Sequence, residues 1–215
     1  MTITKGDFIE IEYTGKIKDG NTVFDTTNPE IAKQNELHSH AGFGPVVICI
    51  GQNQVLQGID KHLEGKEVGK EYSMVIEPEL AFGKKSMQLI QMIPSNKFKA
   101  QHVEPMPGLQ VNIDGVTGLI KTVSGGRVMV DFNHPLSGKD LYYTVKVNKK
   151  VTSDQEKLTG LLKNMLAIKE IDATVHEGKA TVTLKQALPK EAQDHISKKI
   201  TSLVSSIKAV EFSTG

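Results

Sequence analysis

The stretch IEIEYTGKIKDGNTVFD, residues 9–25, carries the strongest local signal for the fold. From Ile9 to Thr14, apolar side chains alternate with charged or polar ones, which is the period of a β-strand that buries one face. The turn residues KDGN follow at 18–21, and a second apolar run begins at Val23. Turn residues of this kind between two strand-like runs are typical of an antiparallel hairpin. The stretch therefore predicts two paired strands at the start of the chain.

The remainder of the first half is expected to add two more strands and a short helix. Val55, Leu56, Ile59 and Leu63 share one face of a helical wheel, which predicts a helix over 54–63. The other expected elements are a long loop with one helical turn at 28–44, a buried strand at 45–50 and a strand at 72–77.

Composition changes near residue 84, where Met, Ile, Leu and Phe occur among few charges. Alternating apolar residues predict short strands at 109–113, 116–120 and 127–130, so residues 84–130 are expected to form a small all-β module. A strand resumes at 143–147.

The last 63 residues change character again. Ser153 and Glu156 form a capping-box pattern for a first helix, and Pro189 stands at the favoured early position of a second. Two strand-like runs lie between the helices, and Val210-Glu211-Phe212 reads as a final strand. Residues 153–215 are therefore predicted to be a separate small α+β domain.

The overall charge points to no particular kind of partner. The net charge is +1, from 26 basic and 25 acidic residues, which gives no argument for nucleic acid or a membrane surface. Cys49 is the single cysteine and lies in an apolar run, so it is expected to be a buried thiol in a reducing compartment. The N-terminus lacks the pattern of a signal peptide. We therefore expect a cytoplasmic protein.

Common catalytic motifs are missing from the sequence. It contains no GxGxxG, GxxxxGK[ST], HExxH, CxxC or GxSxG pattern. Glu36, His38 and His40 come closest to a metal cluster, but residues spaced in this way in a polar loop are more often solvated than liganding. Neither a metal, a cofactor nor a covalent intermediate is expected.

A set of ordered blocks resembles the FKBP-type peptidyl-prolyl cis-trans isomerases. A single Tyr-Thr-Gly would be a weak signal, whereas the whole set in order is specific. The blocks are Tyr13-Thr14-Gly15, Asp19-Gly20, Val23-Phe24-Asp25-Thr26, Pro45 with Ile50-Gly51, Val55-Leu56, Gly58-Ile59, Gly65 with Gly69, Glu77-Pro78 and Ala81-Phe82-Gly83.

An interruption narrows this resemblance to the SlyD-like members. After Gly83 the family normally continues to its last strand, whereas here residues 84–130 intervene and the chain re-enters through Asn133–Gly138. Such an insert in the flap resembles the SlyD-like group, and the C-terminal extension resembles its long archaeal members. The resemblance implies an α+β fold, with an FKBP-like antiparallel half-barrel sheet wrapped on a short helix. Its implied domains are an isomerase domain at 1–83 plus 131–152, an inserted domain at 84–130 and a C-terminal domain at 153–215.

The resemblance also implies a pocket for proline. The residues at the family's pocket positions are Tyr13, Phe24, Asp25, Val46, Val55, Leu56, Ile59, Phe82, His134 and Tyr143. Periodicity alone indicates that most of these residues simply form the hydrophobic core. His134 is equally compatible with a structural position in a turn. Ile59 stands where an aromatic residue is common, and Phe82 replaces a tyrosine whose hydroxyl bonds the substrate.

The insert is expected to bind unfolded or proline-containing polypeptides. Methionine-rich surfaces can repack around varied partners, although the same residues are equally suited to the core of the insert. The candidates are Leu89, Ile90, Met92, Ile93, Phe98 and Met106. The sequence leaves two other functions open: a chaperone that holds unfolded chains without isomerase activity, and a scaffold protein that docks one partner through its C-terminal domain. A homodimer formed through residues 153–215 is a further hypothesis.

Overall fold

A computed structural model describes residues 1–39, 42–100 and 102–215. The chain forms two compact units, of which the first contains Met1–Glu77 and Asp140–Gly215 and the second contains Pro78–Lys139. Every helix in the described ranges is too short or too polar to span a lipid bilayer.

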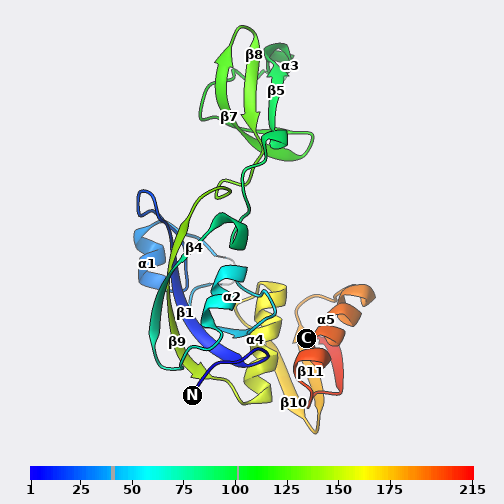
Figure 1. Cartoon of the computed structure of the whole chain (residues 1–215). Helices are drawn as coiled ribbons and strands as arrows, with labels where there is room; N and C mark the ends of the chain where they lie inside the picture. Colours follow the sequence, from blue (N-terminus) through cyan, green and yellow to red (C-terminus); the bar gives the residue numbers. More distant parts are fainter. Residues whose placement is uncertain (40–41, 101) are drawn as a thin grey trace. The chain divides into compact units, whose positions relative to one another are not determined.

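The first unit is built on a five-stranded antiparallel sheet, visible in Figure 1. Its strands follow the order β2-β1-β9-β4. Strand β3 lies on the same side of β1 as β2: β3 pairs with the start of β1, and β2 pairs with its second half. The elements are β1 (Phe8–Ile17), β2 (Val23–Thr26), α1 (Pro29–Gln34), β3 (Val46–Cys49), α2 (Gln57–Leu63), β4 (Glu71–Ile76) and β9 (Leu141–Lys150).

The predicted hairpin is confirmed. Strands β1 and β2 pair antiparallel, with Thr14 opposite Thr26 and Gly15 opposite Asp25. Ile9 and Ile11 are fully buried while Glu10 and Glu12 are half-buried, as the alternation of the sequence requires.

Helix α2 begins later than the sequence predicts. Leu56 keeps an extended backbone at the N-cap, so Val55 and Leu56 precede the helix, whereas Ile59 and Leu63 are buried. Asp60 is also buried, and its carboxylate accepts hydrogen bonds from the backbone N–H of Gly51 at 2.7 Å and of Asn53 at 2.9 Å. These bonds tie α2 to the turn that follows β3, because a buried carboxylate needs such partners.

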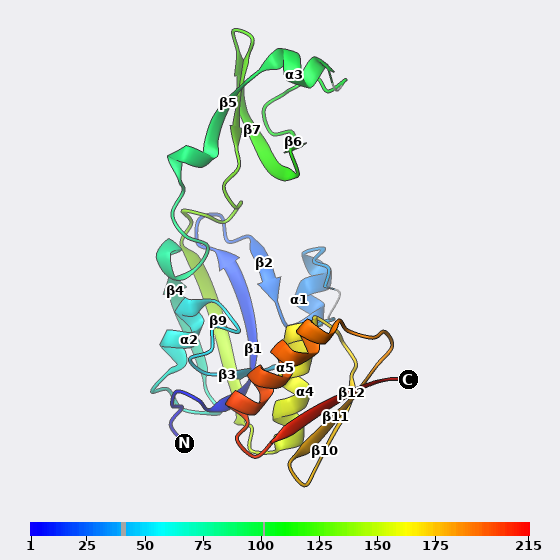
Figure 2. The same ribbon diagram turned by 90° about the vertical axis from the view of Figure 1, so that its right-hand side faces the viewer.

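The C-terminal residues have the predicted order of helix, two strands, helix and strand. Strands β10 and β11 pair antiparallel, β11 and β12 pair parallel, and α5 connects the parallel pair (Figure 2). The elements are α4 (Asp154–Leu166), β10 (Asp172–His176), β11 (Lys179–Leu184), α5 (Lys190–Leu203) and β12 (Ala209–Thr214).

This C-terminal part shares its core with the main sheet. Phe8 of β1 and Cys49 of β3 are buried in one apolar cluster with Leu158, Leu161 and Ile200 of the C-terminal helices. Cys49 is thus the buried thiol that the sequence predicts, and burial raises its pKa to about 11. The sequence treats residues 153–215 as a separate domain, whereas the structure groups them with the main sheet in one compact unit.

The second unit contains a four-stranded sheet in the order β5-β8-β7-β6. The prediction of an all-β module is wrong in one respect, because helix α3 follows β5 and carries Phe98 into the core beside Ile93, Ile120 and Val128. The elements are the 3-10 turns η1 (Pro78–Leu80) and η2 (Met87–Leu89), β5 (Ile90–Pro94), α3 (Ser95–Ala100), β6 (Gln110–Ile113), β7 (Val116–Ser124) and β8 (Arg127–Asp131).

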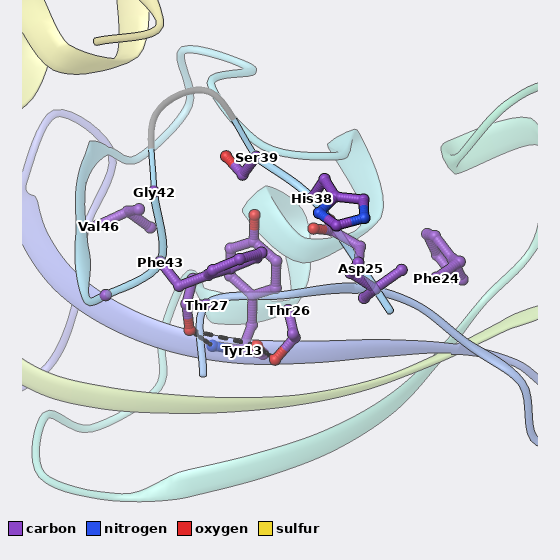
Figure 3. A pocket seen from close by; sticks show the side chains of 12 residues that line it. Tyr13, Phe24, Asp25, Thr26, Thr27, His38, Ser39, Gly42, Phe43 and Val46 are labelled. Atoms are coloured by element: carbon purple, nitrogen blue, oxygen red, sulfur yellow. Dashed lines mark hydrogen bonds between the residues drawn. The ribbon is translucent and has the colours of Figure 1, made fainter. Parts of the chain in front are cut away.

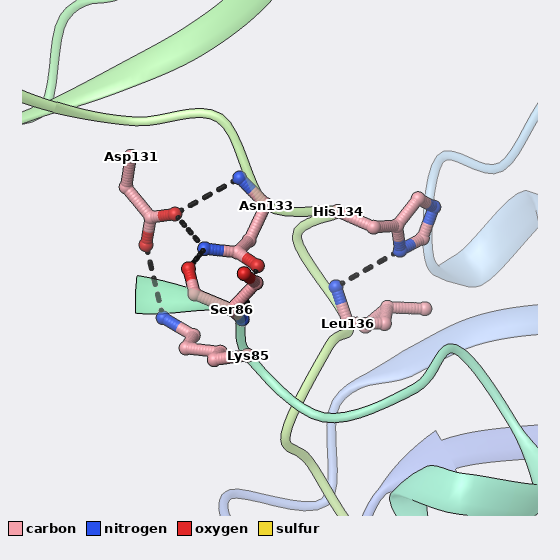
Figure 4. A network of polar contacts seen from close by, with 6 residues as sticks. All are labelled: Lys85, Ser86, Asp131, Asn133, His134 and Leu136. Carbon is pink, nitrogen blue, oxygen red and sulfur yellow. Dashed lines mark hydrogen bonds and ion pairs between the residues drawn. The ribbon is translucent and has the colours of Figure 1, made fainter. Parts of the chain in front are cut away.

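A polar network joins the two segments that lead into and out of this four-stranded sheet (Figure 4). The amide of Asn133 accepts from the backbone N–H of Ser86 at 2.8 Å and donates to the carbonyl of Ser86 at 3.0 Å. Buried Asp131 accepts from Asn133 and from Lys85, whose Nζ lies 3.1 Å away. The Asn133 side chain therefore makes the two hydrogen bonds that a neighbouring strand backbone would make with Ser86. Burial tends to raise the pKa of Asp131, but its hydrogen bonds hold that pKa below the usual value.

Replacing Gly58 tests the contact between α2 and the sheet. An added Cβ would lie 2.3 Å from Cγ2 of buried Ile76. Ala normally stabilises a helix relative to Gly, yet we expect Gly58→Ala to lower the free energy of unfolding by about 1–3 kcal/mol through overpacking. Chemical denaturation measures the change. The control Gln57→Ala, at an exposed position of the same helix, should stay within about 0.5 kcal/mol of the parent. A stabilised Gly58→Ala would contradict the close contact.

Candidate functional site

A cavity of about 300 Å³ opens in the first unit between the β1–β2 hairpin and the segment that precedes β3 (Figure 3). One side consists of strand residues and the other of loop residues. The lining residues are Tyr13, Phe24, Asp25, Thr26, Thr27, Leu37, His38, Ser39, Gly42, Phe43, Gly44 and Val46.

Tyr13 is held in place through its own backbone. Its N–H donates to Thr27 Oγ1 at 2.8 Å, and its carbonyl accepts from the hydroxyls of Thr26 at 3.1 Å and Thr27 at 3.3 Å. Both threonines are buried at the end of β2. The register of the hairpin therefore fixes the aromatic ring at the cavity.

Tyr143 of β9 packs behind the cavity wall. Its ring centroid lies 5.9 Å from that of Tyr13 and 5.9 Å from that of Phe24, in tilted and edge-to-face arrangements. Gly15 stands directly opposite on β1, and a Cβ there would lie 2.6 Å from the Tyr143 ring. Glycine within the strand thus gives the space that the tyrosine ring fills.

Asp25 brings a carboxylate to this aromatic group. The Tyr143 hydroxyl donates to Asp25 Oδ2 at 3.4 Å. Burial raises the pKa of Asp25, and hydrogen bonds from Tyr143 and Tyr13 oppose that rise. Burial, together with the charge of Asp25, raises the pKa of both tyrosines above the usual value. Both hydroxyls therefore remain protonated and donate toward the carboxylate.

The loop side of the cavity was missed in the sequence, where 28–44 reads only as a loop with one helical turn. That turn exists as α1, capped by Asn28. The signal that could have located the wall is Phe43, an isolated aromatic residue between Gly42 and Gly44 in a polar loop. Among the residues described, no three His, Cys, Asp or Glu side chains are grouped as metal ligands. His40 lies outside the described residues.

The structure brings together some of the predicted pocket residues. Tyr13, Phe24, Asp25 and Val46 line the cavity, and Tyr143 contacts three of them from behind. The remaining candidates of the first unit are not among the residues lining the cavity; Val55 and Leu56 are half-buried before α2, and Ile59 is buried within it.

Phe82 and His134 belong to the second unit. Their rings stack with centroids 4.4 Å apart and an angle of 2° between planes. His134 Nδ1 accepts a hydrogen bond from the backbone N–H of Leu136 at 3.2 Å (Figure 4). Their assignment to the proline pocket stays a prediction.

The candidate binding residues of the insert differ in burial. Leu89, Met92 and Met106 are exposed, with 59% of Met92 accessible, and Ile90 is half-buried. The prediction is wrong for Ile93 and Phe98, which fill the core of the insert and offer no surface to a ligand while the insert is folded. Met129 was not predicted as a binding residue, yet it is exposed and pairs across the strands with Met92.

Sequence comparisons relate this chain to a family of known proteins. Residues 91–136 match the family described as "FKBP26, IF domain". The short-type peptidyl-prolyl cis-trans isomerase of Methanocaldococcus jannaschii is 33% identical over 155 residues, which cover 72% of this chain and 98% of that protein. SlyD of Haemophilus influenzae is 30% identical over 152 residues, which cover 68% of this chain and 72% of that protein. The FKBP-type 16 kDa peptidyl-prolyl cis-trans isomerase of Escherichia coli is 28% identical over 151 residues, which cover 68% of this chain and 92% of that protein. The chain therefore belongs to the FKBP-type peptidyl-prolyl cis-trans isomerases, in their SlyD-like group with an insert in the flap.

Proposed function

We propose that this chain isomerises X–Pro bonds in unfolded polypeptides, and that the proline ring binds in the cavity beside Tyr13. The observation that carries the proposal is the composition of this cavity, which combines the aromatic side chains of Tyr13, Phe24 and Phe43 with one carboxylate, that of Asp25. Such a site can surround an apolar ring and still place a polar group next to its amide.

The chemistry needs no acid, base or covalent step. Resonance gives the C–N bond partial double-bond character and a rotation barrier of about 18–20 kcal/mol. A twisted amide has lost that resonance and its charge separation, so it tolerates removal from water better than the planar amide does. A cavity that excludes water therefore favours the twisted form over the planar one, which is differential binding of the transition state.

Asp25 has a positioning role in this mechanism as well as a polar one. Its carboxylate accepts from the Tyr143 hydroxyl, which lies behind the aromatic wall. The pair orders the side chains around the cavity before substrate arrives. Such preorganisation lowers the cost of binding a strained amide.

For the insert, we propose that residues 84–130 hold unfolded segments while these remain tethered to the chain that carries the isomerase cavity. Met92 and Met129 form an exposed apolar pair on adjacent strands, and the thioether chains can adapt to varied sequences. Tethering a segment in this way raises the effective concentration of its prolyl bonds. Both activities would operate in the cytoplasm, where the single thiol Cys49 stays reduced.

A holding chaperone without isomerase activity is the second candidate. It is favoured by the exposed methionines together with Phe82, which lacks a hydroxyl for the substrate carbonyl. The two functions differ in their effect on refolding that is limited by proline isomerisation. An isomerase accelerates such refolding, whereas a chaperone that only holds the chain leaves its rate unchanged or slows it.

Replacing the carboxylate tests the isomerase proposal. We expect Asp25→Asn to lower kcat/KM for a short X–Pro peptide by about ten-fold or more, since hydrogen bonds to charged groups contribute roughly 1.5–3 kcal/mol. Asp19→Asn, an exposed turn residue of the same hairpin, is the matched control and should keep the parent rate. A parent protein with no rate above the uncatalysed reaction would overturn the proposal.

Asp25→Asn should lower activity but raise the stability of the folded protein. Because the pKa of Asp25 is raised by folding, the folded state holds its proton more tightly, and the parent loses stability as pH rises through that raised pKa. Asparagine cannot ionise, so Asp25→Asn should have the higher melting temperature at pH 7. The difference should shrink as pH falls toward the ordinary value of 3.8. Thermal denaturation between pH 3 and 8 measures it, with Asp19→Asn as control; a variant less stable than the parent at pH 7 would contradict the raised pKa.

The role of the insert can be tested without removing it. We expect the double variant Met92→Lys with Met129→Lys to slow catalysed refolding of a proline-limited protein several-fold while sparing short peptides, because two charges on the surface disfavour apolar segments. Gln110→Lys, an exposed strand position of the same sheet, is the control. Deletion of 85–129 should have the same selective effect. Equal losses on peptide and protein substrates would exclude the tethering role.

A further inference from the structure

Residues 42–47, which comprise the end of the loop before β3 and the first two residues of β3, form a wall with two faces. On one face, Gly42, Phe43, Gly44 and Val46 line the cavity. Successive side chains of a strand point to opposite faces, so Val47 points away from the cavity. Val47 packs there against the apolar cluster of the C-terminal helices.

Helix α4 contacts this outer face closely. Gly160 has no side chain at the crossing, and a Cβ there would lie 2.6 Å from Val47 Cβ. One turn later, Asn164 Nδ2 donates to the carbonyl of Val47 at 2.7 Å. Strand β3 pairs with β1 along one edge, so Asn164 satisfies a carbonyl that the ladder does not use.

A second contact lies at the other end of the wall. Lys169 follows the end of α4, where Ala167 turns the chain with a φ of 52°. Its methylene groups cover Gly42, since a Cβ at Gly42 would lie 3.1 Å from Lys169 Cδ. The segment 42–47 is thus held near both ends by the region that follows β9.

We propose that residues 153–215 position the wall of the isomerase cavity, with Asn164 as a positioning residue that acts through Val47 on Val46. The inference rests on the proposed function of this cavity. Gly42 and Gly44 both have positive φ angles, of 76° and 149°, and β3 is only four residues long. A wall of this kind gains order from outside contacts, because glycine backbones lose much conformational freedom when they are fixed.

The test replaces Asn164 by Leu, which removes the donor at similar volume and improves helix propensity. We expect KM for an X–Pro peptide to rise about two- to five-fold, the scale of one hydrogen bond near a surface, while kcat and the melting temperature hold. Lys163→Leu, the exposed neighbour on the same helix, should match the parent in all three. Asn164→Gln keeps an amide donor and should recover part of the loss.

The methyl NMR signals of Val46 give a readout that is independent of catalysis. They should shift in Asn164→Leu and stay in place in Lys163→Leu. Unchanged signals and unchanged KM in Asn164→Leu would overturn the positioning role. Shifted signals in a protein without isomerase activity would instead retain the contact and reject the proposed function.

Discussion

The site depends on the packing of Tyr143 against Gly15 on two neighbouring strands. Gly15 of β1 has no side chain, and the ring of Tyr143 on β9 fills the space that a side chain would occupy. That ring is almost fully buried and contacts Tyr13, Phe24 and Asp25. Any larger residue at position 15 would push the tyrosine out and remove the hydrogen bond from Tyr143 to the Asp25 carboxylate. The close packing of protein interiors makes such a displacement costly, so one glycine determines the position of the aromatic wall.

Asp25 shows how the site and the fold place opposite demands on one group. Burial beside three aromatic rings disfavours the carboxylate, and the two tyrosine hydroxyls offset only part of that cost. A fold optimised for stability alone would place an uncharged residue here. Such a local conflict is expected where a side chain serves function, which is the role proposed for Asp25, and the remaining core of the first unit compensates for it.

Sequence patterns predicted the strands well because alternation and turn residues are local signals. The β1–β2 hairpin and the C-terminal order of elements followed from them. The cavity was only half predictable: Tyr13 and Asp25 lie on a strand pair, whereas Phe43 reaches the cavity from a loop whose path depends on tertiary contacts. Burial in the insert was equally non-local, since Met92 and Ile93 are neighbours in sequence and face opposite sides of their strand.

The shared core changes how the C-terminal residues relate to the isomerase half. Phe8 and Cys49 lie on strands of the main sheet, and they are buried in one apolar cluster with residues of α4 and α5. Unfolding the C-terminal part would therefore expose apolar side chains of β1 and β3 and release the carbonyl of Val47 from Asn164. Regions that share one buried cluster tend to unfold in a single cooperative transition and not one after the other. The C-terminal part thus belongs to the same compact unit as the main sheet, and the cavity wall contacts a helix that lies outside the cavity itself.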